Sequence, residues 1–394
     1  MKTTLIKKAN DFIRKPFFSD YRTLFGLWAL ISIIAGITKI HKCNNFLIFR
    51  YVYWHTVEGV SLYAPYPDCY NDVNHYGPLF SLIIAPFALL PVPAGVILWS
   101  IALGLSLYYA IRVLPLDRRQ HVFIYWFCAH ELMTALFMSQ FNIAIAAIIV
   151  ASFYCITKGK DGWATLLILI GTFVKLYGIV GLAFFFFSRH KLKFILSFIG
   201  WSAVLFVLPM LISSPDYVIG QYREWFDGLI TKNQDNLFSL HQNISLLGMI
   251  RKLSHSASYS DFWIILGGLL LFALPYLRIG QYKFRDFRYA LLASVMLFVV
   301  LFSTGSESSS YIIALVGASI WYVTAPWKRS GWDAALMVFA FILTSMSPSD
   351  LFPAFIRKNL VQPYALKALP CVLIWLKLCW EMCTRNYEAK QVAE

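Results

Sequence analysis

The run Leu79–Ile111 constrains the fold more than any other stretch, because it contains no charged residue. It exceeds the about 20 residues that one helix needs to cross a bilayer, and it is short for two such helices. Pro86, Pro91 and Pro93 divide it. We therefore expect a short helix, a turn at Pro91–Gly95 and then a full helix. Comparable apolar runs recur along the chain and predict an all-α, polytopic membrane protein.

The composition favours the same class of protein. Hydrophobic residues make up 59% of the chain and charged residues only 14%, and the mean hydropathy is +0.63. Soluble domains carry about 25% charged residues. The net charge of +14 comes from Lys and Arg in short connectors between apolar runs, as the positive-inside rule describes. Because no soluble basic domain carries this charge, we expect no nucleic-acid partner.

The apolar runs number about 12, within a range of about 10 to 13. The first, Tyr21–Ile40, is too long for the core of a signal peptide, so we expect it to remain as an anchor. Basic residues before it place the N-terminus in the cytoplasm of a multi-pass protein in the plasma (inner) membrane. Two polar stretches, at about 40–77 and 213–260, then form large outer loops.

Twelve full spans disagree with the positive-inside rule at two connectors. They would place the basic segments Arg112–Arg119 and Lys158–Lys160 outside. A re-entrant segment at Pro78–Leu90, together with a break in the apolar run around Lys175, returns both connectors to the cytoplasmic side. Either arrangement keeps the two long loops on the outer side.

We expect an amphipathic cytoplasmic segment at 1–20, a single transmembrane domain at 21–383 and a cytoplasmic tail at 384–394. The two outer loops carry predicted surface helices, at Asn45–Glu58, Gln221–Leu229 and Leu240–Arg251. The seven cysteines show no metal-binding spacing. Cys43 and Cys69 share the first outer loop and either pair in an oxidising compartment or stay as two free thiols.

Ionisable residues inside apolar runs are costly and point to function. Lys175 lies near the middle of WATLLILIGTFVKLYGIVGLAFFFF, about a dozen residues from either end, which is too far for comfortable snorkelling. We expect its ammonium to face a cavity, where it holds a phosphate or pairs with a carboxylate. Glu131 also lies in an apolar run and needs a partner or a proton. A structural Glu131–Lys175 pair is an open alternative.

Other polar residues have two readings each. Gln140 and Asn142 either join helices by hydrogen bonds or bind a sugar hydroxyl. Glu307, in FSTGSESSSY, is either a helix cap or a general base. Asp72 in the first outer loop is a general base or a solvated surface residue, and His241 in the second loop points toward the first or stays inert. Such a set suits a lipid-linked anionic substrate, with a base that activates a hydroxyl and a cation that stabilises the departing phosphate.

Three stretches carry a family resemblance: NNFLIFRYVYWHTVEGVSLY, HYGPLFSLIIAPFALLP and SQFNIAIAAIIVASFYCITKGKDGWATLLILIGTFVKLYGIV. In this order and spacing they resemble the membrane enzymes of glycosyltransferase family 87, over about Thr38 to Ser345. The resemblance implies a GT-C fold and transfer of a hexose or pentose from a polyprenyl-phosphate sugar at the outer face, without metal or other cofactor. The implied partners are that donor, a lipid-linked or cell-envelope glycan acceptor and membrane lipid.

The resemblance also implies roles for single residues. The family places its proposed base, an Asp, fourteen positions before a Gly, and counting back from Gly59 reaches Asn45, which cannot accept a proton. Paired His residues of the family correspond to Ser309 and Ser310. We therefore expect the catalytic acid to lie at Asp72 or Glu307. The predicted substrate-binding residues are Lys175, Asn45, Gln140, Asn142, His241, Gln242, Asn243 and Glu131.

The loss of the family's acid leaves a second hypothesis open. A branch without transferase activity would bind a lipid-linked sugar or move it across the membrane, as a flippase or transporter does. A transferase is expected to show a single outward cavity with a lateral groove at Lys175, whereas a transporter is expected to show sites open to either side.

Overall fold

The structure is a computed structural model that describes residues 15–256 and 258–388. Every regular element in these ranges is a helix, which confirms the predicted all-helical class. Residues 1–14 of the expected N-terminal segment and residues 389–394 of the expected tail lie outside the described residues.

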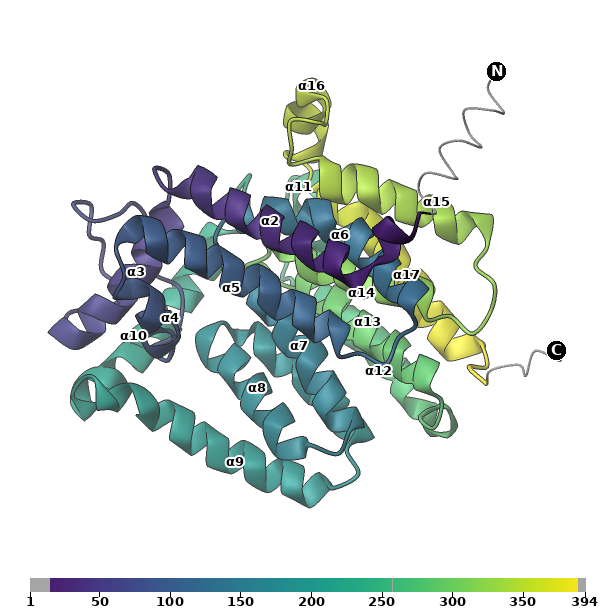
Figure 1. The fold of residues 1–394 in the computed structure, drawn as a ribbon, viewed down its shortest axis with the longest axis horizontal. Helices are drawn as coiled ribbons and strands as arrows, with labels where there is room; N and C mark the ends of the chain where they lie inside the picture. The colour runs from purple at the N-terminus through teal and green to yellow at the C-terminus, as the bar shows by residue number, and fades with distance from the viewer. Residues whose placement is uncertain (1–14, 257, 389–394) are drawn as a thin grey trace.

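Most long helices run along the longest axis of the molecule (Figure 1). Their bounds, in chain order, are α2 Tyr21–Lys39, α5 Val92–Arg112, α6 Arg118–Phe137, α7 Asn142–Thr157, α8 Asp161–Val174, α9 Lys191–Val207, α12 Phe262–Ala273, α13 Arg285–Leu301, α14 Tyr311–Val323, α15 Gly331–Phe339 and α17 Leu369–Thr384. At the centre lies α14, in which every residue from Tyr311 to Trp321 is buried. By contrast, α9 is apolar but exposes Leu196 and Ile199 at 60% each. An apolar helix that is buried on all sides belongs to the core, and an apolar exposed face such as that of α9 suits contact with lipid.

Three helical segments of the described chain have the length and apolarity of a membrane span. They are α2, α5 and the segment Lys191–Leu211, which joins α9 to the 3₁₀ turn Leu208–Leu211. Several other apolar helices are shorter. The chain is a membrane protein, and the count of about twelve spans stays a prediction.

The uncharged run at 79–111 forms the short helix α4 Phe80–Ala88, a turn and the long helix α5. Both ends of α4 lie against α3 (Asn44–Glu58). The Phe80 ring packs on Phe49 with centroids 5.1 Å apart, and the Arg50 guanidinium donates to the Leu90 carbonyl. With nine residues, α4 is too short to span a bilayer, and the re-entrant arrangement stays a prediction. The turn is shorter than expected, because Pro93 fits the first turn of α5, where no N–H donor is needed.

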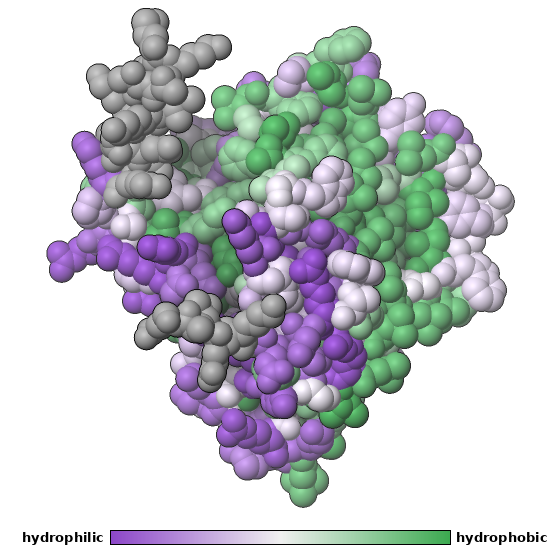
Figure 2. All heavy atoms as spheres, turned by 90° about the vertical axis from the view of Figure 1, so that its right-hand side faces the viewer, coloured by the Kyte–Doolittle hydropathy of each residue, from purple (hydrophilic) through white to green (hydrophobic). Residues whose placement is uncertain are grey.

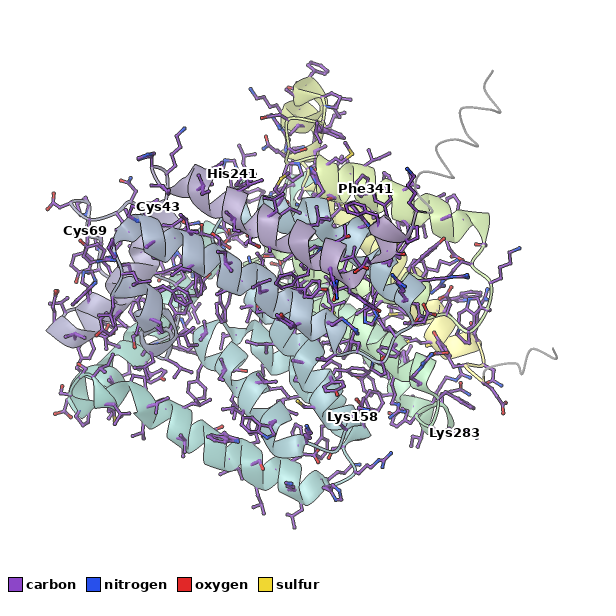
Figure 3. The ribbon with its side chains drawn as sticks, viewed as in Figure 1. Cys43, Cys69, Lys158, His241, Lys283 and Phe341 are labelled. Atoms are coloured by element: carbon purple, nitrogen blue, oxygen red, sulfur yellow. The ribbon has the colours of Figure 1, made fainter. Side chains whose placement is uncertain are left out.

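Basic connectors gather at one end of the bundle. The Arg118 Nε donates to the Ser19 carbonyl at 2.8 Å, and the Arg278 Nη1 donates to the Arg385 carbonyl at 2.6 Å. Figure 2 looks at this end, where hydrophilic residues gather beside a large apolar area. Lys158 lies at this end and Cys43 at the other (Figure 3). The connectors at 112–119 and 158–160 thus share the end at which α2 begins, as the re-entrant arrangement predicts, and the membrane side of this end stays a prediction.

The two predicted outer loops pack on each other at the opposite end. The predicted helix Gln221–Leu229 lies within the longer α10 (Pro215–Asp235). The Gln221 Oε1 accepts from the Leu62 N–H at 2.7 Å, and Ser61 Oγ donates to Glu224 Oε2 at 2.6 Å. These contacts place both loops on the same side of the bundle.

The predicted helix Leu240–Arg251 is wrong in its first turn. The helix α11 runs only over Leu246–Ser254, where the Ser245 hydroxyl caps its start by accepting from the Gly248 N–H. Before the cap, Asn243 has a φ of 52°, which interrupts a helix. Of the alternatives for the thiols, the structure shows Cys43 and Cys69 free.

Candidate functional site

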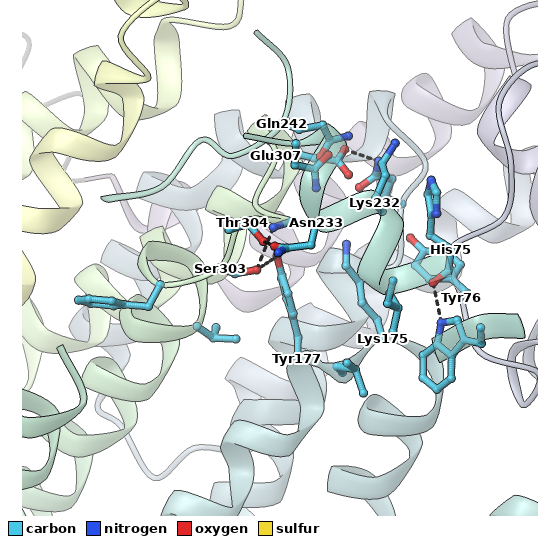
Figure 4. A pocket seen from close by; sticks show the side chains of 18 of the residues that line it. His75, Tyr76, Lys175, Tyr177, Lys232, Asn233, Gln242, Ser303, Thr304 and Glu307 are labelled. Atoms are coloured by element: carbon cyan, nitrogen blue, oxygen red, sulfur yellow. Dashed lines mark hydrogen bonds between the residues drawn. The ribbon is translucent and has the colours of Figure 1, made fainter. Parts of the chain in front are cut away.

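A cavity of about 540 Å³ opens between the two loops and the break after α8 (Figure 4). Its polar and charged lining comes from segments far apart in the sequence: Asn45, Asp72, His75, Tyr76, Gln140, Lys175, Tyr177, Lys232, Asn233, Asn236, Gln242, Asp261, Ser303, Thr304 and Glu307. Six of the ten predicted site residues are therefore in the lining. We call this space the Lys175 cavity.

The break in the apolar run brings Lys175 to this cavity. The helix α8 ends at Val174, Lys175 has an extended backbone, and the 3₁₀ segment η2 (Leu176–Phe187) turns back along α8. The Gly77 N–H donates to the Val174 carbonyl at 3.1 Å and satisfies a group that the helix end leaves free. A Cβ on Gly178 would lie 2.4 Å from the carbonyl carbon of Gly171, so this return needs glycine. In Figure 4, Lys175 and Tyr177 rise side by side into the cavity.

A chain of amides joins Lys175 to Glu307. The Lys175 Nζ donates to Asn142 Oδ1 at 2.8 Å, and Asn142 Nδ2 donates to Gln140 Oε1 at 2.9 Å. The Gln140 Nε2 then donates to Glu307 Oε2 at 2.5 Å. Asn142 is fully buried, which makes it a support behind the cavity rather than part of its lining. The cation and the carboxylate are thus held apart, so the ammonium keeps donors for a ligand.

The segment Ser303–Ser310 is fixed from several directions. Tyr177 Oη and Ser303 Oγ lie 2.9 Å apart, and the Ile244 N–H donates to the Ser306 carbonyl at 2.8 Å. Ser309 Oγ donates to Gln140 Oε1 at 2.9 Å. Glu307 itself precedes the 3₁₀ turn Ser308–Ser310, so it occupies a cap position while its carboxylate bonds to Gln140. Glu307 therefore occupies a helix-cap position and also lines the cavity.

Glu131 does not reach the cavity, and the suggested Glu131–Lys175 pair is wrong. Its Oε1 lies 3.0 Å from the Lys367 Nζ, and both side chains are buried. The same Nζ donates to the carbonyl and hydroxyl oxygens of Ser308, each at 2.9 Å. Sequence reasoning missed Lys367, although a lysine in the last apolar run was a signal of the same kind as Lys175.

Asp72 and His75 stand together where the cavity meets the first loop. Asp72 has a φ of 74° and its side chain is 61% exposed; its Oδ1 lies 4.0 Å from His75 Nε2. The Trp225 indole donates to the His75 carbonyl at 2.9 Å. Burial, followed by the charge of Lys232, lowers the pKa of His75 to about 4; Lys175 adds to this lowering, while Asp72 and Asp235 oppose it. The imidazole is therefore neutral at neutral pH. Sequence reasoning missed His75, which follows Asp72 by three positions.

Of the remaining predicted residues, two line the cavity and two do not. The Asn45 Nδ2 donates to the Met138 carbonyl at 2.7 Å while the residue lines the cavity, and Gln242 lines it too. His241 is exposed and does not line the cavity. Asn243 is buried and accepts from the Ser245 hydroxyl at 2.7 Å, so it shapes the loop.

The site offers cations, carboxylates and amides beside an apolar wall. Among residues 15–256 and 258–388, no three His, Cys, Asp or Glu side chains group as a metal site would require. The apolar wall is lined from η2, α12 and α13 by Ile179, Val180, Ile265, Phe298, Val299 and Phe302. Such a combination can hold an anion that is attached to a lipid chain.

Comparison with known proteins identifies the family. The model of glycosyltransferase family 87 matches residues 74–304, which is more than half of the chain and includes the break at Lys175. No curated protein and no solved structure matches the chain, so the GT-C fold stays a prediction. The match confirms the resemblance seen in the sequence. The chain belongs to glycosyltransferase family 87.

Proposed function

We propose that this protein transfers a hexose or pentose from a polyprenyl phosphate to a lipid-linked or cell-envelope glycan at the outer face of the plasma membrane. The observation that carries the proposal is the Lys175 cavity, where an ammonium and a carboxylate are joined through Asn142 and Gln140 next to an apolar wall. The proposal needs no metal and no other cofactor.

The donor would lie with its phosphate at Lys175 and its prenyl chain along the apolar wall. An ammonium at the bridging phosphate stabilises the charge that develops as the phosphate departs. The rings of Tyr177 and Tyr76, with centroids 5.0 and 5.8 Å from the Lys175 Nζ, favour the ammonium form by cation–π attraction. Because the wall contains no charge, it suits a hydrocarbon chain.

The transfer balances as a single displacement. The acceptor hydroxyl oxygen forms a bond to the anomeric carbon as the bond from that carbon to the phosphate oxygen breaks. The hydroxyl proton passes to a carboxylate, and the polyprenyl phosphate leaves with the electron pair. We assign the proton to Asp72, because its carboxylate is exposed at the cavity whereas that of Glu307 is bonded to Gln140. Glu307 is the alternative acceptor.

A specific observation favours the rival function, binding or movement of a glycolipid without chemistry. The resemblance aligns Asn45 with the family's base, and the Asn45 amide donates to the Met138 carbonyl. The test is to incubate the purified protein in nanodiscs with a panel of polyprenyl-phosphate hexoses and pentoses and follow release of polyprenyl phosphate. The transferase releases it in the presence of an acceptor glycan. Binding of donors without release from any of them would favour the rival.

A further inference from the structure

A second cavity adjoins the Lys175 cavity and has different chemistry. Its volume is about 270 Å³, and it lies between the loop 63–75 and α10. It is smaller than the about 300 Å³ at which pockets for drug-sized ligands begin. Its own side chains include Tyr63, Thr231 and Asp235. We call it the Asp235 cavity.

The two cavities share one wall. Asp72, His75, Trp225 and Lys232 line both of them. His75 Nε2 is buried in this wall and has no hydrogen-bond partner in the described part of the chain. A buried polar atom without a partner is costly, and a ligand hydroxyl would satisfy it. The free Nε2 therefore points to a ligand with a polar group at the junction, and a hydroxyl suits it because a hydroxyl can either donate or accept.

The walls of the Asp235 cavity are fixed before any ligand arrives. Tyr63 Oη donates to the Tyr76 carbonyl at 3.0 Å, and Asn74 Nδ2 donates to the same oxygen at 2.9 Å. The Trp225 indole is bonded to the His75 carbonyl. Preorganised polar groups raise affinity because they lose little freedom when a ligand binds.

The Asp235 cavity has charges of both signs, as the Lys175 cavity does, but it lacks Lys175. Asp72 and Asp235 bring two carboxylates and Lys232 one ammonium, next to the Thr231 hydroxyl and the neutral His75 imidazole. An anionic ligand would meet the two carboxylates. Val73, Trp225 and Leu229 give this cavity apolar surface, but the six side chains that form the apolar wall of the Lys175 cavity do not line it. A neutral ring that carries several hydroxyl groups can donate to the carboxylates and accept from the ammonium.

We infer that the Asp235 cavity is the acceptor subsite and holds a terminal sugar ring of a neutral glycan, with the reacting hydroxyl directed between His75 and Asp72. This inference rests on the proposed transfer reaction and adds where the acceptor binds and which chemistry it has. The donor sugar then reaches the acceptor hydroxyl from the Lys175 cavity, beside the residues that line both cavities.

Gly228 provides a direct test, because it lines only the Asp235 cavity and a Cβ built there meets nothing within 4 Å. Gly228→Phe places a ring in the lining of this cavity, and its Cβ meets no wall atom within 4 Å. Gly220→Phe is the matched control, since Gly220 lies in the same helix, is equally open and lines neither cavity. Both changes replace glycine within a helix, so neither lowers helix propensity.

The first readout is equilibrium binding of unreactive alkyl glycosides to the protein in nanodiscs. Saturation-transfer NMR measures this binding. The wild type and Gly220→Phe are expected to bind at millimolar concentration, and Gly228→Phe is expected to lose the signal at least about tenfold. Equal signals from all three proteins, or no binding of any neutral sugar to the wild type, would overturn the inference.

The second readout separates this inference from the proposed function. In Gly228→Phe, release of polyprenyl phosphate that depends on an acceptor should need at least about tenfold more acceptor, while the KM for the donor stays unchanged. An unchanged acceptor KM would overturn the acceptor subsite and leave the transferase proposal standing. A third outcome is that the wild type binds glycosides but releases no polyprenyl phosphate, and that Gly228→Phe loses this binding. That result would support the sugar-binding subsite and contradict the transferase proposal.

Discussion

The Lys175 cavity and the Asp235 cavity meet at one wall but are built from different parts of the molecule. The Lys175 cavity takes its cation from a broken helix and its apolar wall from η2, α12 and α13. The Asp235 cavity is made by a loop and α10, and none of the six side chains of that apolar wall lines it. The contrast separates two ligands: an anion on a lipid chain fits the first cavity, and a neutral polar ring fits the second.

The sharpest way to break this contrast is to change the carboxylate in the shared wall. Asp72→Asn should slow sugar transfer about 10²- to 10⁴-fold, the usual contribution of a general base, with little change in the donor KM. Asn tolerates the positive φ of this position, so the loop should keep its form. Glu307→Gln should slow transfer by about tenfold, because it removes only the charge that balances Lys175. Steady-state rates of polyprenyl phosphate release would show the reverse order if Glu307 takes the proton.

The wall that carries Glu307 depends on a buried ion pair. Lys367→Met leaves the Glu131 carboxylate without its partner and should lower the free energy of unfolding by about 3–5 kcal/mol. The double variant Lys367→Met/Glu131→Gln removes the unpaired charge and should recover most of the loss. Thermal unfolding in detergent measures both. A single variant as stable as the wild type would contradict the structural role of the pair.

Removal of the cation should affect the first cavity alone. Lys175→Met should slow release of polyprenyl phosphate about 10²- to 10³-fold, since it deletes the group that stabilises the departing phosphate. Binding of alkyl glycosides should stay unchanged. Lys158→Met is the matched control, because Lys158 is exposed at the opposite end of the bundle. Loss of glycoside binding in Lys175→Met would show that the two cavities are not separate sites.

The smallest expected effect concerns His75. Its pKa falls from 6.5 to about 4 on folding, so the unfolded chain binds the proton more readily. Stability should therefore be complete above pH 6.5 and decline as the pH falls toward 4, by at most about 1 kcal/mol because a third of the side chain is exposed. His75→Gln should flatten this part of the pH profile. Thermal unfolding between pH 7 and pH 4 measures the difference.

Local chemistry in the sequence predicted much of the fold and part of the site. Prolines in an uncharged run predicted the helix, turn and helix at 79–111, and a lysine in an apolar run predicted a group that faces a cavity. Both signals lie within one stretch of chain. A charged side chain in lipid is costly whichever residue pairs with it. Lys175 and Glu131 could therefore both be identified from the sequence without knowledge of their partners.

The identity of the partners could not be predicted in the same way. Glu131 and Lys367 meet across 236 positions, and Lys175 meets Asn142 rather than an acid. His75 becomes a site residue only because Trp225 and Lys232, from the second loop, pack on the first. Contacts of this kind follow from how the helices pack, and the pattern of a single sequence does not show this packing.

Product analysis of one reaction tests the central claim most directly. The purified protein in nanodiscs is incubated with a polyprenyl-phosphate sugar and an alkyl glycoside, and the new glycoside and the freed polyprenyl phosphate are quantified together. A transferase yields the two in equal amounts, and both fall in Lys175→Met and Asp72→Asn. Donor that binds at the Lys175 cavity but is recovered intact, with no glycoside formed from any sugar of the panel, would contradict the account.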